Sequence, residues 1–244
     1  MSQTSTTAVT PPPANVVSRF VGIITSPKST FQGVVAHPRW FGMLALTTLI
    51  VLACTVAPMF TEWGRQAALD QQVKGMESFG MTVTDDVYAR LEQQMRFAPY
   101  TTGIGILIFS PLMALIVAGI LFAVFNAAMG GEASFKQLVA VVVHAGVISA
   151  LAQLFTAPLN FARGSMGSAT NLGVLLPMLE ETSFMARLMG MIDLFMVWYV
   201  LVLAMGLAVL YRRKTQPIAI SLMVVYGVIA LTVAAVMSSF GGSN

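Results

Sequence analysis

The chain has 244 residues, of which 57% are hydrophobic and only 9% are charged. Its mean hydropathy is +0.80, whereas an average soluble domain is about 45–50% apolar and about 25% charged. So few charges cannot cover the surface of a soluble fold of this size. This excludes a soluble enzyme, a disordered protein, a coiled coil and a secreted disulfide scaffold, and it predicts an all-α, polytopic membrane protein.

The formal charge of +3 does not indicate a nucleic-acid partner, because several basic residues lie beside apolar runs. Arg39 precedes one such run, and Arg212-Arg213-Lys214 separates two others. At these places cations suit anionic lipid headgroups and orient a membrane protein. The single cysteine, Cys54, lies in an apolar stretch and cannot form an internal disulfide.

The first 40 residues precede the first long apolar run. Residues 1–14 are rich in Ser, Thr and Pro and carry no charged side chain, which predicts a disordered tail and not a secretory signal. In residues 15–40, Asn15 caps one short helix, Ser26-Pro27 begins a second, and His37-Pro38 ends it. These helices are apolar on one face with basic residues at the margins, so we expect them to lie on the membrane surface. The marginal basic residues are Arg19, Lys28 and Arg39.

Five apolar runs are long enough to cross a bilayer, which takes about 20 residues at 1.5 Å each. They predict a five-helix bundle forming one membrane domain over residues 41–239, followed by a short tail at 240–244. The predicted spans are Phe41–Phe60, Gly103–Ala128, Gln137–Leu159, Leu188–Tyr211 and Pro217–Met237.

The distribution of basic residues predicts a cytoplasmic N-terminus and an external C-terminus. In that orientation seven basic residues face inside and six face outside, and the dense Arg212-Arg213-Lys214 turn strengthens the assignment. The inside set is Arg19, Lys28, Arg39, Lys136, Arg212, Arg213 and Lys214. The outside set is Arg65, Lys74, Arg90, Arg96, Arg163 and Arg187.

The external loop at residues 61–102 is predicted to be helical. Thr84 with two following acids reads as a helix start, and an apolar stripe follows at four-residue spacing, formed by Val87, Leu91 and Met95. A second helix is expected over Glu62–Phe79, interrupted at Gly80. The loop therefore predicts a small external cap.

Motifs of soluble enzymes and metal sites do not occur in the sequence. It has no CxxC, HExxH, P-loop or GxSxG pattern, and two histidines with one cysteine do not make an ordinary structural zinc site. We therefore expect no catalytic residue, no cofactor and no metal.

Three polar residues inside or next to the predicted spans are functional candidates, because polar groups are expensive in a bilayer. His144 and Asp193 differ by roughly 12 Å in expected depth, which argues against a direct proton relay. Either residue is a proton or cation site, or His144 bonds between helices while Asp193 reaches interfacial water; we favour the second interpretation. Asn126 is expected to satisfy the backbone of the Gly130-Gly131-Glu132 turn.

Two segments carry a family resemblance. Ile23–Phe31, with His37–Trp40 directly before the first span, resembles the opening of bacterial Yip-one-domain proteins. Phe125–Gln137, followed by His144, resembles that family's turn between its second and third spans. The resemblance covers about Val16–Met237 and implies five spans with a cytoplasmic N-terminus.

The resemblance also sets expectations about partners. Eukaryotic relatives bind Rab-type GTPases, but this chain lacks their Asp-Leu-Tyr-Gly-Pro-like signature and an acidic or aromatic-rich N-terminal region. We therefore do not expect a Rab-type GTPase as partner. The expected partners are the lipid bilayer and other membrane proteins or a second copy of the chain, in a bacterial inner membrane.

The expected function is that of a non-enzymatic membrane protein that organises partners or lipids, with a small transporter using Asp193 and His144 as the alternative. The candidate contacts lie in the N-terminal helices and in the turn, where Ser134 can cap a helix and Glu132 and Lys136 form an i,i+4 pair. They are Pro27, Phe31, Arg39, Trp40, Gly130, Gly131, Glu132, Ser134, Phe135 and Lys136.

Overall fold

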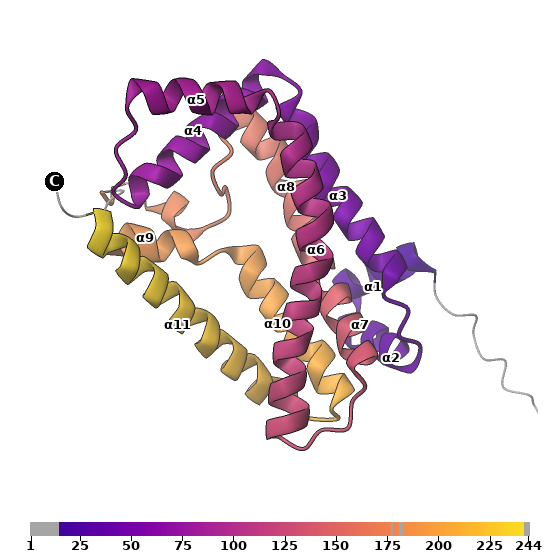
Figure 1. Cartoon of the computed structure of the whole chain (residues 1–244). Coiled ribbons are helices and arrows are strands. Elements are labelled where there is room, and N and C mark those ends of the chain that lie inside the picture. Colours follow the sequence, from indigo (N-terminus) through magenta and orange to yellow (C-terminus); the bar gives the residue numbers. More distant parts are fainter. Residues whose placement is uncertain (1–14, 177, 181–182, 242–244) are drawn as a thin grey trace, which may run out of the picture.

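The computed structural model describes residues 15–176, 178–180 and 183–241. The predicted tail at residues 1–14, and residues 242–244 of the predicted C-terminal tail, lie outside the described residues. All named elements are helical (Figure 1). They are α1 (Val16–Thr25), α2 (Pro27–Ala36), α3 (Phe41–Met59), α4 (Glu62–Ser78), α5 (Asp85–Met95), α6 (Ala98–Phe122), the π-helical η1 (Ala123–Ala128), α7 (Phe135–Ala145), α8 (Val147–Arg163), the 3-10 turn η2 (Leu172–Leu175), α9 (Phe184–Met191), α10 (Leu194–Leu210) and α11 (Thr215–Gly241).

Within the described residues, four helical stretches are long and apolar enough to cross a membrane, as a polytopic helical membrane protein requires. They are Phe41–Met59, Ala98–Ala128, Phe135–Arg163 and Thr215–Ser239. The apolar helix α10 has 17 residues, which gives it a length of about 25 Å against about 30 Å of hydrocarbon. The number of five spans therefore stays a prediction.

The predicted span Leu188–Tyr211 is not a single helix, and in this respect the sequence prediction was wrong. The helix breaks at Ile192-Asp193, between α9 and α10. Asp193 Oδ1 accepts hydrogen bonds from the backbone N–H groups of Phe195 (2.8 Å) and Met196 (3.2 Å). Aspartate is a favoured N-cap because it satisfies the unpaired N–H groups of a first turn. Asp193 thus begins a helix, where the sequence analysis placed it inside one.

The third stretch is the centre of the bundle. Of its most apolar part 61% is buried, against 11–17% in the other three stretches. A one-residue interruption at Gly146 separates α7 from α8. The high burial means that α7 and α8 contact protein on most sides, whereas α3, α6 and α11 leave apolar surface for lipid.

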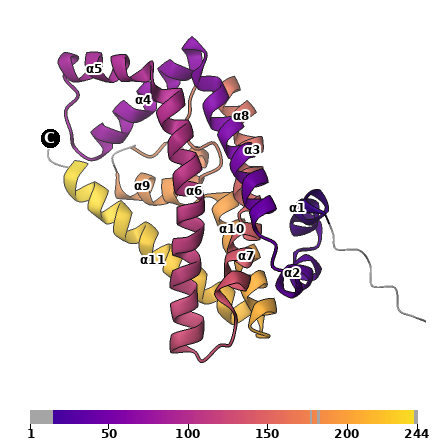
Figure 2. The ribbon, with the colours of Figure 1, turned by 45° about the vertical axis from the view of Figure 1, so that its right-hand side comes forward.

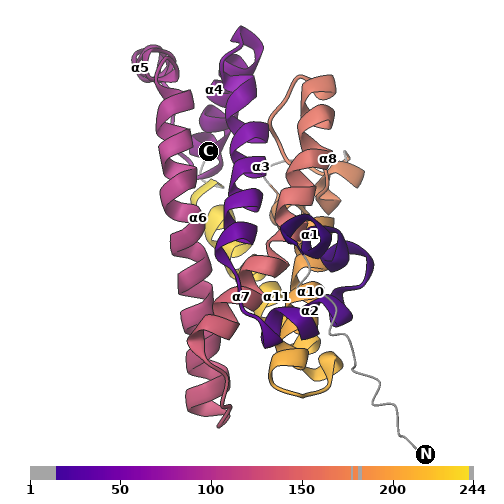
Figure 3. The ribbon, with the colours of Figure 1, turned by 90° about the vertical axis from the view of Figure 1, so that its right-hand side faces the viewer.

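The two N-terminal helices form as predicted. Asn15 Oδ1 accepts from the N–H of Ser18 (2.7 Å), Pro27 begins α2 and His37 ends it. They also pack against the bundle, beside α7, α8 and α10 (Figure 2, Figure 3), and their expected position on the membrane surface stays a prediction. The side chains of Ile23, Phe31 and Val34 are wholly buried.

Arg19 was expected at the margin of these helices, but only 7% of the residue is exposed. Its guanidinium donates to the carbonyl oxygen of His37 (3.4 Å). Burial, together with the charge of Arg39, lowers the pKa of Arg19. This arginine therefore joins α1 to the end of α2.

Phe31 of α2 packs against Gly206 of α10. A Cβ at Gly206 would lie 2.7 Å from Cγ1 of Val141 on α7 and 2.9 Å from the Phe31 ring. Only a residue without a side chain lets the three helices approach this closely. Gly206 therefore fixes where α2 docks.

The two helices predicted for residues 61–102 form as α4 followed by α5, and the external position of this cap stays a prediction. Thr84 caps α5 (3.4 Å to the N–H of Val87), and Gly80 has the positive φ of +76° that ends α4. The cap has its own small core, made by Leu69, Leu91, Met95 and Ala98. It lies at the end of the bundle opposite the turn at residues 129–134, which follows η1 and is called the α6–α7 turn below (Figure 1, Figure 3).

Candidate functional site

The α6–α7 turn begins α7 with a reciprocal cap. Ser134 Oγ accepts from the N–H of Gln137 (3.3 Å), and Gln137 Oε1 accepts from the N–H of Ser134 (3.0 Å). The capping role expected for Ser134 is confirmed. Gln137 Nε2 also donates to the carbonyl of Val35 (3.1 Å), so the turn is fastened to α2.

Asn126 satisfies the backbone of the turn, as predicted. Its Nδ2 donates to the carbonyl of Ala133 (2.7 Å), and its Oδ1 accepts from the hydroxyl of Tyr211 (2.7 Å). The Tyr211 ring stacks on Phe125 with centroids 4.9 Å apart. Sequence reasoning missed Tyr211. Its position just before the basic turn is typical of an interfacial aromatic residue, but that signal does not name its partner.

The local geometry explains why both residues of the turn, Gly130 and Gly131, are glycines. Gly130 has a φ of +68°, which a residue with a side chain rarely adopts. A Cβ on Gly131 would lie 2.6 Å from Cε1 of Tyr211 and 2.7 Å from the carbonyl oxygen of Phe125. These glycines therefore shape the turn, and their role as contact residues stays a prediction.

The remaining predicted contact residues differ in accessibility. Phe31 is buried and cannot meet a partner, so that prediction was wrong. Trp40 is half-buried, with its ring edge-on to Phe41 at 6.0 Å. Pro27 is also half-buried. The exposed members of the whole predicted set are Arg39, Gly130, Glu132, Ser134, Phe135 and Lys136.

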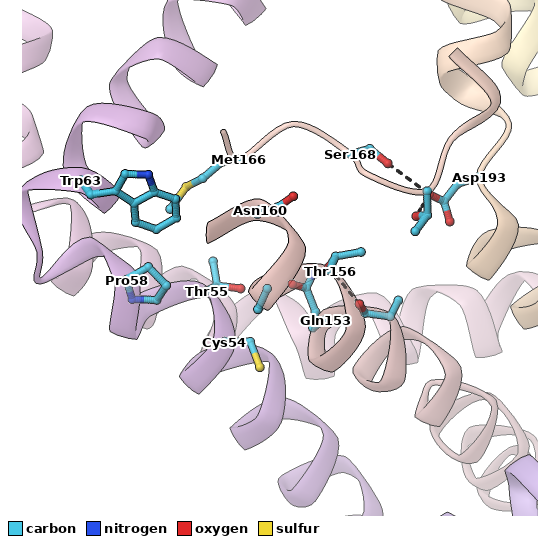
Figure 4. Close-up of a pocket in the computed structure, with 13 residues that line it drawn as sticks. Cys54, Thr55, Pro58, Trp63, Gln153, Thr156, Asn160, Met166, Ser168 and Asp193 are labelled. Carbon is cyan, nitrogen blue, oxygen red and sulfur yellow. Dashed lines mark hydrogen bonds between the residues drawn. The ribbon is translucent and has the colours of Figure 1, made fainter. Parts of the chain in front are cut away.

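A second polar region surrounds Asp193, beside a cavity of about 400 Å³ bounded by α3, α8 and the segment at 164–171 (Figure 4). Asp193 Oδ2 accepts from the hydroxyls of Ser168 (3.1 Å) and Thr170. Trp63 Nε1 and Asn160 Oδ1 are buried here without a hydrogen-bond partner among the described residues. Sequence reasoning did not predict this cluster, because polar side chains scattered over a loop and two helices leave no local pattern.

His144 lies elsewhere. It is wholly buried, its Nδ1 is 2.7 Å from the carbonyl oxygen of Ala140 one turn earlier, and it is not among the residues that line the Asp193 cavity. The expected bond to another helix is therefore replaced by one within α7. Within the described ranges, no three His, Cys, Asp or Glu side chains are grouped to hold a metal.

Comparison with known families gives one match. The Yip1 domain matches residues 21–237, a range that contains the α6–α7 turn, the Asp193 cap and the contact of Phe31 with Gly206. No curated protein and no solved structure matches the chain. Because the match covers almost the whole sequence, the chain belongs to the Yip1 domain family.

Proposed function

We propose that this Yip1-domain chain is a non-enzymatic membrane protein that gathers partner proteins or organises lipids at the cytoplasmic face of a bacterial inner membrane. It acts through the outer side of α1–α2 and the exposed residues of the α6–α7 turn. The N-terminus is cytoplasmic and the C-terminus external, in line with the positions of the basic residues. Partners are other membrane proteins or a second copy of the chain, and not a Rab-type GTPase.

The observation that carries this proposal is the double-sided apolar character of α1. One side buries Ile23 in the bundle core, while Val17 and Val21, one turn apart, are 64% and 50% exposed. An apolar face on a short helix outside the four membrane-length stretches favours contact with lipid or with another protein. The outer side of α1 therefore supports a role in recruitment.

The test replaces Val17 and Val21 by serine in the full chain in native membranes. Deletion of residues 15–37 would be less informative, because it would also remove Phe31 from the core. We expect the double variant to insert normally and to lose crosslinked partners or associated lipid, measured by mass spectrometry.

The matched control is Phe79→Ser with Met81→Ser, which removes two apolar groups that are 48% and 47% exposed at the other end of the bundle. The control is expected to keep the partners. An unchanged set of partners and lipids in the Val17/Val21 variant, or the same loss in both variants, would contradict the proposal.

The alternative is a small transporter, and its support is the cavity beside Asp193. It predicts pH-dependent flux in proteoliposomes that Asp193→Asn abolishes. It has weaker support than recruitment, because His144 does not line that cavity and the Asp193 carboxylate already accepts four hydrogen bonds.

A further inference from the structure

A cleft of about 520 Å³ opens between α2 and the turn that joins α10 to α11. Lys28 lines it from α2, and the consecutive Arg212, Arg213 and Lys214 line it from the turn. All four side chains are exposed, and none of the residues that line the cleft is acidic. Packing of α2 on α10 thus brings Lys28, which is distant in the sequence, next to the three consecutive cations of the turn.

Two helix starts add to this positive charge. Lys28 lies in the first turn of α2, and Thr215, which also lines the cleft, begins α11. A helix N-terminus carries a partial positive charge that acidic side chains usually offset. Neither first turn has an acidic residue, and no side chain caps α2. Side chains and backbone therefore favour the same ligand, an anion.

The backbone at Arg212 is also unusual. Its φ is +51°, the left-handed region that residues with side chains rarely adopt. The N–H of Arg213 donates to the carbonyl of Ala208 (2.9 Å), which closes the end of α10. Glycine is the usual residue at this place in such a helix end. Backbone geometry therefore disfavours an arginine here, whereas its charge suits an anion in the cleft.

The surroundings of the cleft indicate a lipid. Helix α11 is one of the membrane-length stretches, and beyond the cleft it exposes an apolar ridge at four-residue spacing. The ridge consists of Ile220, Val224 and Val228, which are 56–59% exposed. A cleft at the end of such a helix lies at headgroup depth, while the ridge meets acyl chains.

We propose that the cleft formed by Lys28, Arg212, Arg213 and Lys214 binds the headgroup phosphate of an anionic phospholipid. The site goes beyond recruitment by α1, because Val17 and Val21 do not line it. It would stand even if no protein partner bound α1.

The test measures lipid retention by the purified full-length protein, using native mass spectrometry with phosphatidylglycerol and phosphatidylcholine. The main variant is the triple Lys28→Gln, Arg213→Gln, Lys214→Gln. We expect phosphatidylglycerol affinity to fall about fivefold for each cation removed, with no change for phosphatidylcholine. The matched control removes three exposed cations from the external cap, Lys74→Gln, Arg90→Gln and Arg96→Gln, and is expected to leave binding unchanged.

Arg212→Gly separates binding from folding, because glycine adopts the local backbone conformation readily. We expect it to lose about fivefold in phosphatidylglycerol affinity while the protein stays folded. Equal retention by wild type and both cleft variants would overturn the proposal, as would an equal loss in the cap control. Displacement of the lipid by inorganic phosphate would overturn it in favour of a soluble phosphate ligand. The Val17/Val21 variant is expected to bind phosphatidylglycerol like wild type, so this proposal and the proposed function fail separately.

Discussion

Two polar networks interrupt this apolar chain, one at the α6–α7 turn and one at the α9–α10 break. At the turn, Asn126 and Gln137 bond to partners from distant segments. At the break, Asp193 accepts four hydrogen bonds, but Trp63 Nε1 and Asn160 Oδ1 beside it are buried without partners among the described residues. Both networks border a cavity, of about 470 Å³ at the turn and about 400 Å³ at the break, but among the described residues only the second has buried polar groups without partners.

The difference shows that the pairing of buried polar groups decides their role in a membrane protein. A buried polar group costs free energy unless it is paired. A network whose buried groups are all paired therefore holds one arrangement of the chain, while buried groups without protein partners are free to bind water. The residues of the turn network are then framework, and the proposed contacts with lipid or partners fall to exposed neighbours such as Arg213 and Lys136.

Gln137 of the turn network bonds to α2, and Phe31 of α2 lies in the core. The largest expected effect on stability therefore comes from Phe31→Ala. Phe31 is wholly buried against Gly206, and its truncation should lower the free energy of unfolding by about 3–5 kcal/mol. Thermal unfolding in detergent measures this. Phe41→Ala, at a residue that is 72% exposed, should change stability little. Equal effects of the two substitutions would mean that α2 is not part of the core.

The network at the break is tested by Asp193→Ala. Loss of the cap and of two hydroxyl bonds should destabilise the protein by about 1–3 kcal/mol. Asp193→Asn should cost less, since asparagine also caps helices. Chemical denaturation of the two variants measures the difference. If asparagine is as damaging as alanine, the charge of Asp193, and not its capping, is what the protein requires.

At the turn, Tyr211→Phe removes one hydrogen bond and keeps the ring that stacks on Phe125. The variant should lose about 1 kcal/mol of unfolding free energy, measured in the same way. Tyr100→Phe, at a residue that is 62% exposed, is the control. A neutral Tyr211→Phe would show that the network at the turn does not contribute to stability.

The smallest effect has the opposite sign. Arg212→Gly relieves the left-handed backbone at φ +51° and should stabilise the protein by about 0.5–1 kcal/mol, after the entropy cost of glycine. Arg213→Gly, one residue later and without positive φ, should not stabilise it. If Arg213→Gly also stabilised the protein, backbone strain at Arg212 would not explain the effect of Arg212→Gly.

Local signals in the sequence predicted much of the framework correctly. Asn15 and Ser134 were recognised as caps, Pro27 as a helix start, and Asn126 as the residue that satisfies the turn. The caps and the helix start depend on residues within about one turn of one another, and Asn126 bonds to Ala133 seven residues later, so the chain carries these signals locally. The break at Asp193 also had a local signal, an N-cap residue inside an apolar run, but hydropathy averaged over a window conceals it.

By itself, then, the sequence determined a helical membrane protein, its caps and the apolar stretches, because solvent preference and capping are properties of neighbouring residues. Only the tertiary structure decided that Phe31 is buried against Gly206, that Tyr211 bonds to Asn126, and that Lys28 joins Arg212–Lys214 around one cleft. These pairs are separated by 85 residues or more along the chain. Their contacts depend on how closely helices approach, and helix approach is set by the packing of the whole bundle.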